Sequence, residues 1–175
     1  MGNDVFLSTK IKNLTLPKNV RELSDANSFD TIDTLENLFV VDDNPYYVSI
    51  DGVMYTKDMS TLYLIPKRKN ISYFSVPYGV KTIATGAMQN IYISVLVISE
   101  TVRTCGAYFG RYSQIQYMIF KQKPGQIVFS TTQYFQSAKY TPILDYMSEI
   151  VPTCNHQEII LRKFSYQFIF VFILI

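Results

Sequence analysis

The sequence predicts a β-rich solenoid, in which short coils of chain stack on one another and each coil adds a strand to a common sheet. Three observations support this fold class: a recurring strand motif, a nearly constant spacing between its copies, and one longer interval that contains a second pair of strand-like runs. A single coil of this length cannot bury its own apolar side chains, so stacking is required to close a continuous core.

The strand motif reads apolar-x-apolar-Pro, with further apolar residues three and six positions after the proline. Residues 14–23 and 74–83 are its clearest copies, and a third copy has Ser99 in place of the proline. Period two places the two apolar side chains on the core face and the middle residue on the outer face. Proline then ends the strand, because it cannot donate to a continuing ladder. The predicted strand starts are Leu14, Leu38, Phe74, Leu96 and Met118.

These starts are 24, 36, 22 and 22 residues apart, so the second interval contains an insertion. Within it, two strand-like runs, 53–55 and 62–65, flank a polar connection and predict a β-hairpin. Asp51-Gly52 is expected to form the turn that starts the first hairpin strand, because Gly can supply a positive φ. The segments that return from one strand to the next are expected to be short and helical or irregular.

The pattern divides the chain into four parts. Residues 1–10 lead in, 11–124 form the solenoid with the hairpin inserted at 44–66, 125–163 form a degenerate repeat or a cap, and 164–175 form an apolar tail. The tail is too short to span a bilayer, which takes about 20 apolar residues. Its β-branched and aromatic content favours a buried or partly disordered terminal strand. The alternatives are a truncated membrane anchor and a chain end that does not belong to the ancestral domain.

Composition and the candidate reactive residues indicate a non-catalytic protein. Apolar residues make up 48% of the chain and charged residues 17%, with a net charge of +2, which excludes intrinsic disorder and disfavours nucleic-acid binding. His156 and Cys154 are too few to complete a zinc site. Cys105 occupies a core position and is expected to be a small buried hydrophobe. Residues 42–44 fit no calcium loop and are expected to form a solvated turn. We therefore expect no catalytic residue, no metal and no cofactor.

The motifs resemble those of the BspA-like leucine-rich repeat family. Residues 14–23 and 74–88 match the family pattern apolar-x-Ile-Pro-x-x-Val-x-x-Ile, which ends in Ala-Phe, and three of the spacings lie within the 20 to 29 residues typical of leucine-rich repeats. Residues 43–55 resemble the family element Asn-Pro…Tyr…Ile-Asp-Gly-Val-Leu-Tyr. The resemblance covers about residues 11–120 and departs at Met88, where the family has Phe. It implies a leucine-rich-repeat solenoid of the kind found in surface or secreted antigens that adhere to host proteins or other cells.

The candidate binding site is the outer face of the predicted sheet. Its residues are Thr15, Phe39, Tyr73, Ser75, Val97, Tyr117 and Ile119. A row of exposed aromatic residues favours protein contact, because Tyr supplies a large contact area at low entropic cost. Solenoids use extended surfaces of this kind for recognition. The alternative is that the hairpin or the tail covers this face.

We expect a non-catalytic protein-binding repeat domain, which the family resemblance suggests is a cell-surface or secreted adhesin or antigen. The expected partner is a protein, with host and extracellular-matrix proteins as candidates, and not a nucleic acid; membrane association is left open. No signal peptide is recognisable at the N-terminus, so the localisation rests on the resemblance alone. The alternatives are a truncated repeat remnant without an independent binding role and an intracellular scaffold.

Overall fold

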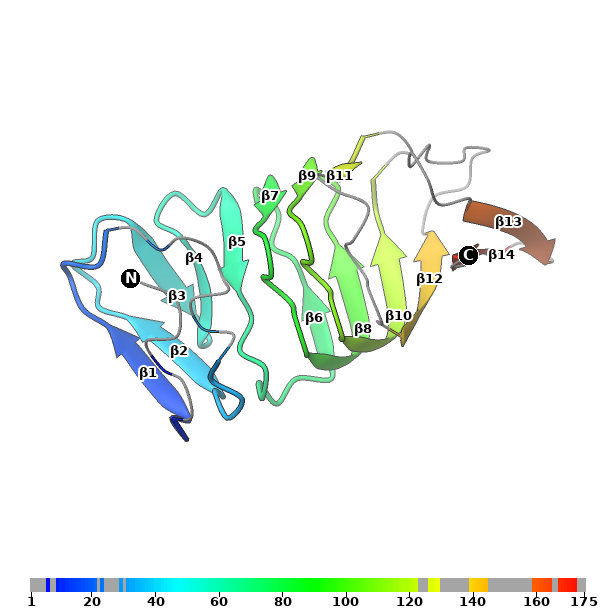
Figure 1. The fold of residues 1–175 in the computed structure, drawn as a ribbon. Coiled ribbons are helices and arrows are strands. Elements are labelled where there is room, and N and C mark those ends of the chain that lie inside the picture. The colour runs from blue at the N-terminus through cyan, green and yellow to red at the C-terminus, as the bar shows by residue number, and fades with distance from the viewer. Residues whose placement is uncertain are drawn as a thin grey trace.

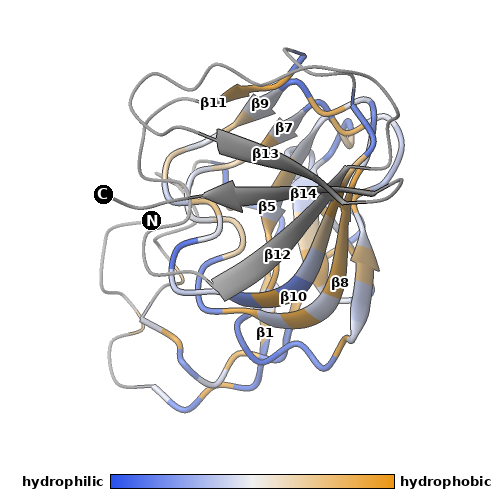
Figure 2. Ribbon diagram, turned by 90° about the vertical axis from the view of Figure 1, so that its right-hand side faces the viewer, coloured by the Kyte–Doolittle hydropathy of each residue, from blue (hydrophilic) through white to orange (hydrophobic). Residues whose placement is uncertain are grey.

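The chain winds into a stack of coils with strands along two of its sides (Figure 1). The computed structural model describes residues 6, 9–21, 23, 29, 31–122, 126–129, 139–144, 159–164 and 167–172, and from residue 129 onward it describes the strands alone. Viewed end-on, the strands of successive coils lie over one another on opposite sides of the molecule (Figure 2). No α-helix is present in the described residues. The fold is therefore a β-solenoid, as the sequence predicts.

The strands that carry the motif form one side of the stack. β1 (Asn13–Leu16) pairs in parallel with β2 (Asn37–Val40). In a second sheet, β6 (Tyr73–Ser75), β8 (Tyr92–Ile98) and β10 (Gln114–Phe120) pair in parallel. The predicted starts are aligned in register within each sheet: Leu14 with Leu38, and Phe74 with Leu96 and Met118.

The expectation of one common sheet is wrong at a single point, between β2 and β6. These two strands belong to separate sheets, because the inserted hairpin occupies the interval between them in the sequence. The edge of β2 that faces away from β1 is engaged by this insertion: the N–H of Leu38 donates to the carbonyl of Gly52 at 3.0 Å, and the N–H of Val40 donates to Ser49 Oγ at 2.9 Å. The outer surface predicted to be continuous is therefore divided in two.

Beyond β10 the sheet continues with further strands. β12 (Lys139–Leu144) pairs in parallel with β10 and adds one more rung to the ladder. β13 (Ile159–Phe164) and β14 (Gln167–Phe172) form an antiparallel pair, and β14 also pairs with β12. The terminal strand expected from the apolar tail is therefore present as β14.

The opposite side of the stack is a six-stranded sheet that begins with the insertion. β3 (Tyr47–Ile50), β4 (Val53–Thr56) and β5 (Thr61–Leu64) are antiparallel, so the predicted hairpin is confirmed and has one additional strand before it. From β5 the sheet continues in parallel through three two-residue strands: β7 (Thr82–Ile83), β9 (Thr104–Cys105) and β11 (Val128–Phe129).

Where the structure describes them, the return segments are short strands and turns without α-helix, so the irregular form expected for them holds there and the helical one does not. Each two-residue strand is stabilised by the coil before it: the N–H groups of Arg103 and Thr104 both donate to the carbonyl of Lys81, at 2.7 and 3.1 Å. Ile83 and Cys105 stand at the last apolar position of their repeats and are in register. Cys105 is 1% exposed, as expected for a small core residue, and burial raises the pKa of its thiol.

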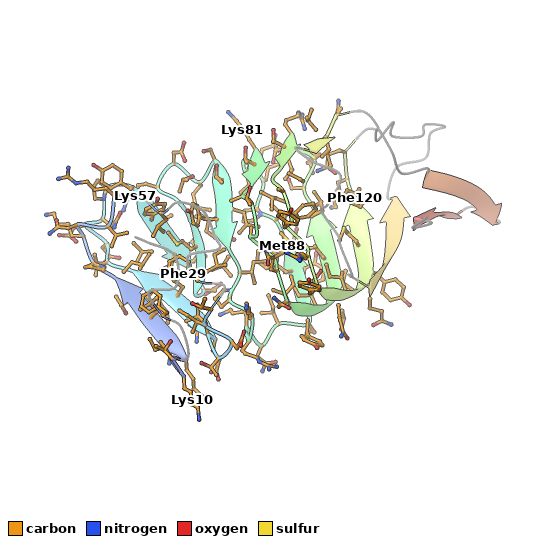
Figure 3. All side chains as sticks on the ribbon, in the orientation of Figure 1. Lys10, Phe29, Lys57, Lys81, Met88 and Phe120 are labelled. Carbon is orange, nitrogen blue, oxygen red and sulfur yellow. The ribbon has the colours of Figure 1, made fainter. Side chains whose placement is uncertain are left out.

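The hairpin forms a wall between two apolar cores rather than lying over one core. Along β4 the side chains alternate, so Val53 and Tyr55 face one core and Met54 faces the other. On β5 the alternation is interrupted: Leu62 faces the C-terminal core, whereas Leu64 packs with Met54 in the N-terminal core, and the pairing of β4 with β5 is irregular at this point. Because both faces are buried, its strands read as continuous apolar runs. Phe29 and Met88 mark the two halves in Figure 3. The N-terminal core contains Leu16, Leu23, Phe29, Ile32, Leu35, Leu38, Tyr47, Met54, Tyr63 and Leu64. The C-terminal core includes Val53, Tyr55, Leu62, Ile83, Met88, Leu96, Cys105, Phe109 and Met118.

The turn between β3 and β4 is the one predicted at Asp51-Gly52. Both residues have positive φ values, 49° and 72°. At Gly52 a Cβ atom would lie 2.6 Å from the side-chain oxygen of Asn37, so the position needs glycine for close approach as well as for its backbone angle. The turn therefore determines both the register of the hairpin and its distance from β2.

Residues 42–44 differ from the solvated turn expected of them. Asp42 and Asp43 are exposed, but Asn44 is fully buried. Its side-chain nitrogen donates to the carbonyls of Pro17 and Val20 at 3.0 and 3.3 Å, and its oxygen accepts the N–H groups of the two residues that follow Pro45, at 2.8 and 2.9 Å. Asn44 thus joins the turn after β1 to the turn after β2, and burial is tolerated because its polar atoms are satisfied.

Candidate functional site

The candidate site lies on the outer side of β6, β8 and β10, opposite the C-terminal core. Phe74, Leu96 and Met118 point inward and their immediate neighbours point outward. Ile93 and Ile115 also face the core, so on β8 and β10 the alternation changes phase and two consecutive residues face outward before Leu96 and Met118. We call the outward set the tyrosine face. It comprises Tyr73, Ser75, Tyr92, Ser94, Val95, Gln114, Gln116, Tyr117 and Ile119.

Three tyrosines dominate this face. Tyr73 is 59% exposed, Tyr92 57% and Tyr117 39%. The strand register places Tyr73 beside Val95 and Val95 beside Tyr117, so that one row across the strands reads Tyr-Val-Tyr. Tyr92 is paired with Gln114, whose amide nitrogen lies 3.3 Å from the Tyr92 hydroxyl. The face therefore presents large rings together with hydrogen-bonding groups.

The tyrosine face carries no charge. None of the residues of β6, β8 and β10 is Asp, Glu, Lys or Arg. The two-stranded sheet of β1 and β2 begins in a polar strip instead: Lys69 Nζ donates to Asn37 Oδ1 at 2.7 Å, and Asn37 Nδ2 donates to Asn13 Oδ1 at 2.9 Å. A surface without charges is suited to close contact, because no ion has to lose its hydration when a partner covers it.

The predicted site residues fall into two groups on the two sheets. Thr15 and Phe39 lie side by side on β1 and β2, where both are exposed, and Phe39 is 43% exposed. Tyr73, Ser75 and Tyr117 are exposed on the tyrosine face. Because the two sheets are separate, the structure does not bring these two groups into one continuous row.

Two of the predicted residues are less available than expected. Val97 is only 3% exposed, so its prediction as an exposed contact residue is wrong. Val97 lies on the middle strand of the three, between Ser75 on β6 and Ile119 on β10. Ile119 itself is half-buried.

Sequence reasoning missed Tyr92 and the two glutamines of β10. The motif begins at Leu96 and Met118, but β8 and β10 each start four residues earlier, at Tyr92 and Gln114. The signal was present as alternation, polar-apolar-polar, in residues 92–94 and 114–116. It was missed because the shorter copies of the motif have no such extension.

Other features of the described residues do not converge on a second site. A cavity of about 10 Å³, room for one water molecule, lies near Phe29, Leu64 and Pro66. The part of the chain with described positions contains no group of three or more His, Cys, Asp or Glu side chains that could hold a metal ion. Cys154 and His156 lie outside the described residues.

The parallel strands at 22-residue spacing, the apolar-x-apolar positions in register and the open sheet face define a leucine-rich-repeat solenoid. Solved structures bear this out. The pneumococcal vaccine antigen PcpA is similar over 74% of this chain and 50% of its own, with 17% identity and a TM-score of 0.52. A leucine-rich cell surface protein from Faecalibacterium prausnitzii is similar over 80% of this chain and 49% of its own, with 14% identity and a TM-score of 0.53.

At these identities the similarity shows the fold, and the resemblance seen in the sequence motifs is confirmed at that level. The chain spans about half the length of each of these two proteins. No family model and no curated protein matches the sequence. In the described part of the chain, no helix has the length and apolar character needed to cross a membrane.

Proposed function

We propose that this chain is a non-catalytic binding domain that recognises a protein through its tyrosine face. The uncharged, tyrosine-rich surface of β6, β8 and β10 is the observation that carries the proposal. Tyrosine has few rotatable bonds for its area, so ordering Tyr73, Tyr92 and Tyr117 against a partner costs little conformational entropy. Interface cores are enriched in such residues and depleted of charge.

The scaffold supports this use of the face. Phe74, Leu96 and Met118 anchor the inner side of the same strands in the C-terminal core, where Leu96 and Met118 have no exposed surface. The backbone that carries the tyrosines is therefore held before a partner arrives, and little ordering of the chain remains to oppose binding. A surface built on parallel strands in register is also more rigid than one built on loops.

A cell-surface or secreted location, with the role of an adhesin or antigen, is part of the proposal. It is supported by the motif resemblance and by the two solved structures of similar fold, a vaccine antigen and a cell surface protein. Labelling of intact cells with a membrane-impermeant reagent, followed by detection of the tagged protein, tests this part. Labelling only after lysis would favour the intracellular scaffold instead.

The binding proposal is tested by screening the purified chain against a panel of extracellular-matrix and cell-surface proteins by biolayer interferometry. We expect Tyr73→Ala and Tyr117→Ala each to weaken a specific interaction by about tenfold or more, since buried tyrosines are common hot spots. Tyr78→Ala is the matched control, because Tyr78 is 79% exposed but follows β6 in a turn outside the face.

Phe39→Ala tests whether the separate β1–β2 surface takes part, and we expect it to change affinity less than twofold. If a partner is found and neither tyrosine variant weakens it while Phe39→Ala does, the binding face has been assigned to the wrong sheet. A soluble, monomeric chain that unfolds cooperatively would count against the truncated repeat remnant, and binding to nothing in the panel would count against the proposed binding function.

A further inference from the structure

The spacing of the tyrosines points to one class of partner. We infer that the tyrosine face binds a proline-rich segment in the polyproline II conformation, laid across β6, β8 and β10 along the Tyr73-Val95-Tyr117 row. The inference rests on the proposed function and specifies its ligand. It is drawn from the register of the row, the hydrogen-bonding groups around it and the absence of charge.

The first argument is a match of two repeats. Neighbouring strands in a sheet are about 4.8 Å apart, so Tyr73 and Tyr117, which are two strands apart in one row, lie about 9.6 Å apart at their backbones. A polyproline II helix rises about 3.1 Å per residue with three residues per turn, so it repeats about every 9.3 Å. Residues i and i+3 of such a segment can therefore each meet one tyrosine ring.

The residue between the two tyrosines strengthens this match. Val95 is half-buried, whereas Tyr73 and Tyr117 are both exposed. The side chains therefore project further from the sheet at the two ends of the row than in its middle. This leaves room for the two ligand residues that lie between the ring contacts. Aromatic side chains are the usual contacts of polyproline II segments.

The second argument is the kind of hydrogen bond the face can offer. Proline has a carbonyl acceptor but no N–H donor, so a proline-rich ligand needs donors from its receptor. The face supplies hydroxyl groups from its tyrosines and serines and amide groups from Gln114 and Gln116. A partner rich in carboxylates would find no cation on these strands, and a basic partner would find no carboxylate.

The test uses a labelled decaproline peptide, which spans about 31 Å in the polyproline II form, and a Gly-Ser peptide of equal length as the flexible comparator. Fluorescence anisotropy should show at least tenfold preference for decaproline. Tyr73→Ala and Tyr117→Ala should each reduce decaproline affinity by about tenfold, and Tyr78→Ala should leave it within twofold.

A spacing variant separates this inference from a generally adhesive surface. The double substitution Val95→Tyr, Tyr117→Ala keeps two tyrosines on the row but halves their separation to about 4.8 Å. Far-UV circular dichroism checks that it is folded. We expect it to bind decaproline as weakly as Tyr117→Ala does; wild-type affinity in this variant, or equal binding of the Gly-Ser peptide, would overturn the inference.

Competition distinguishes failure of this inference from failure of the proposed function. If Tyr73→Ala and Tyr117→Ala abolish the binding of a panel protein but decaproline does not displace that protein, the face binds protein and the polyproline II assignment is wrong. If no panel protein depends on the two tyrosines and decaproline does not bind, both proposals fail.

Discussion

At the scale of single residues, the solenoid depends on a few side chains that connect one coil to the next. Asn44 bonds to both ends of the turn that follows β1. Thr101 does the same in the C-terminal half: its hydroxyl donates to the carbonyl of Val80 at 2.9 Å and accepts the N–H of Gly79 at 3.0 Å. These bonds fix the offset between coils where no strand pairing does so.

Asn44→Ala should therefore destabilise the protein by about 2 kcal/mol or more, because it removes the partners of two carbonyls and two N–H groups in a buried turn. Asp43→Ala, in the same turn, removes only an exposed ion pair with Lys18 and should cost less than about 1 kcal/mol. Urea denaturation monitored by far-UV circular dichroism measures both. Equal midpoints for the two variants would contradict the role assigned to Asn44.

At the scale of elements, the hairpin decides how the molecule is divided. The polar connection and the apolar runs predict its two strands, but they do not indicate what lies on each face. In the structure Met54 packs into the N-terminal core and Leu62 into the C-terminal core, and neither has any exposed surface. On the side of the stack that carries the motif, the hairpin interrupts the series of strands between β2 and β6. On the opposite side it forms the first strands of the six-stranded sheet.

Met54→Ala and Leu62→Ala should consequently both be costly, each lowering the free energy of unfolding by about 2 to 5 kcal/mol through a buried cavity. A hairpin lying on the surface would tolerate one of the two. Ile50→Ala, at the exposed end of β3, is the control and should cost less than about 1 kcal/mol. Chemical denaturation measures the free energy of unfolding of the three variants. A nearly unchanged value for Met54→Ala would contradict the placement of the hairpin as a wall between the two cores.

At the scale of the whole molecule, the two cores share this wall, so each loses one boundary if the other unfolds. The coils are also linked by backbone hydrogen bonds outside the strands, such as the N–H of Ile65 donating to the carbonyl of Ala87 at 2.8 Å. We therefore expect one cooperative unfolding transition for the described solenoid.

Cys105 provides a probe of this cooperativity, because its thiol is buried in the C-terminal core and its raised pKa keeps it protonated and unreactive. In a Cys154→Ser background, pulsed alkylation of Cys105 across a urea series should give the same midpoint as far-UV circular dichroism. Alkylation at clearly lower urea would mean that the C-terminal core opens by itself.

Much of this architecture follows from local pattern. The motif apolar-x-apolar-Pro, with apolar residues at fixed offsets, predicts where a strand lies, where it ends and which of its side chains point inward. The register of Phe74, Leu96 and Met118 could therefore be predicted from the sequence. The hairpin and the Asp51-Gly52 turn were equally local, because turn chemistry depends on adjacent residues. The buried state of Cys105 followed from its place in the repeat.

What only the tertiary structure decided concerns neighbours that are distant in sequence. The break between β2 and β6, the burial of Val97 on the middle strand of its sheet and the burial of Asn44 all depend on which coil packs beside which. The same holds for the tyrosine face: each tyrosine is visible in the sequence, but their common row arises from strand pairing across 22 residues. Periodicity specifies which way a side chain points, whereas exposure depends on what the rest of the chain places next to it.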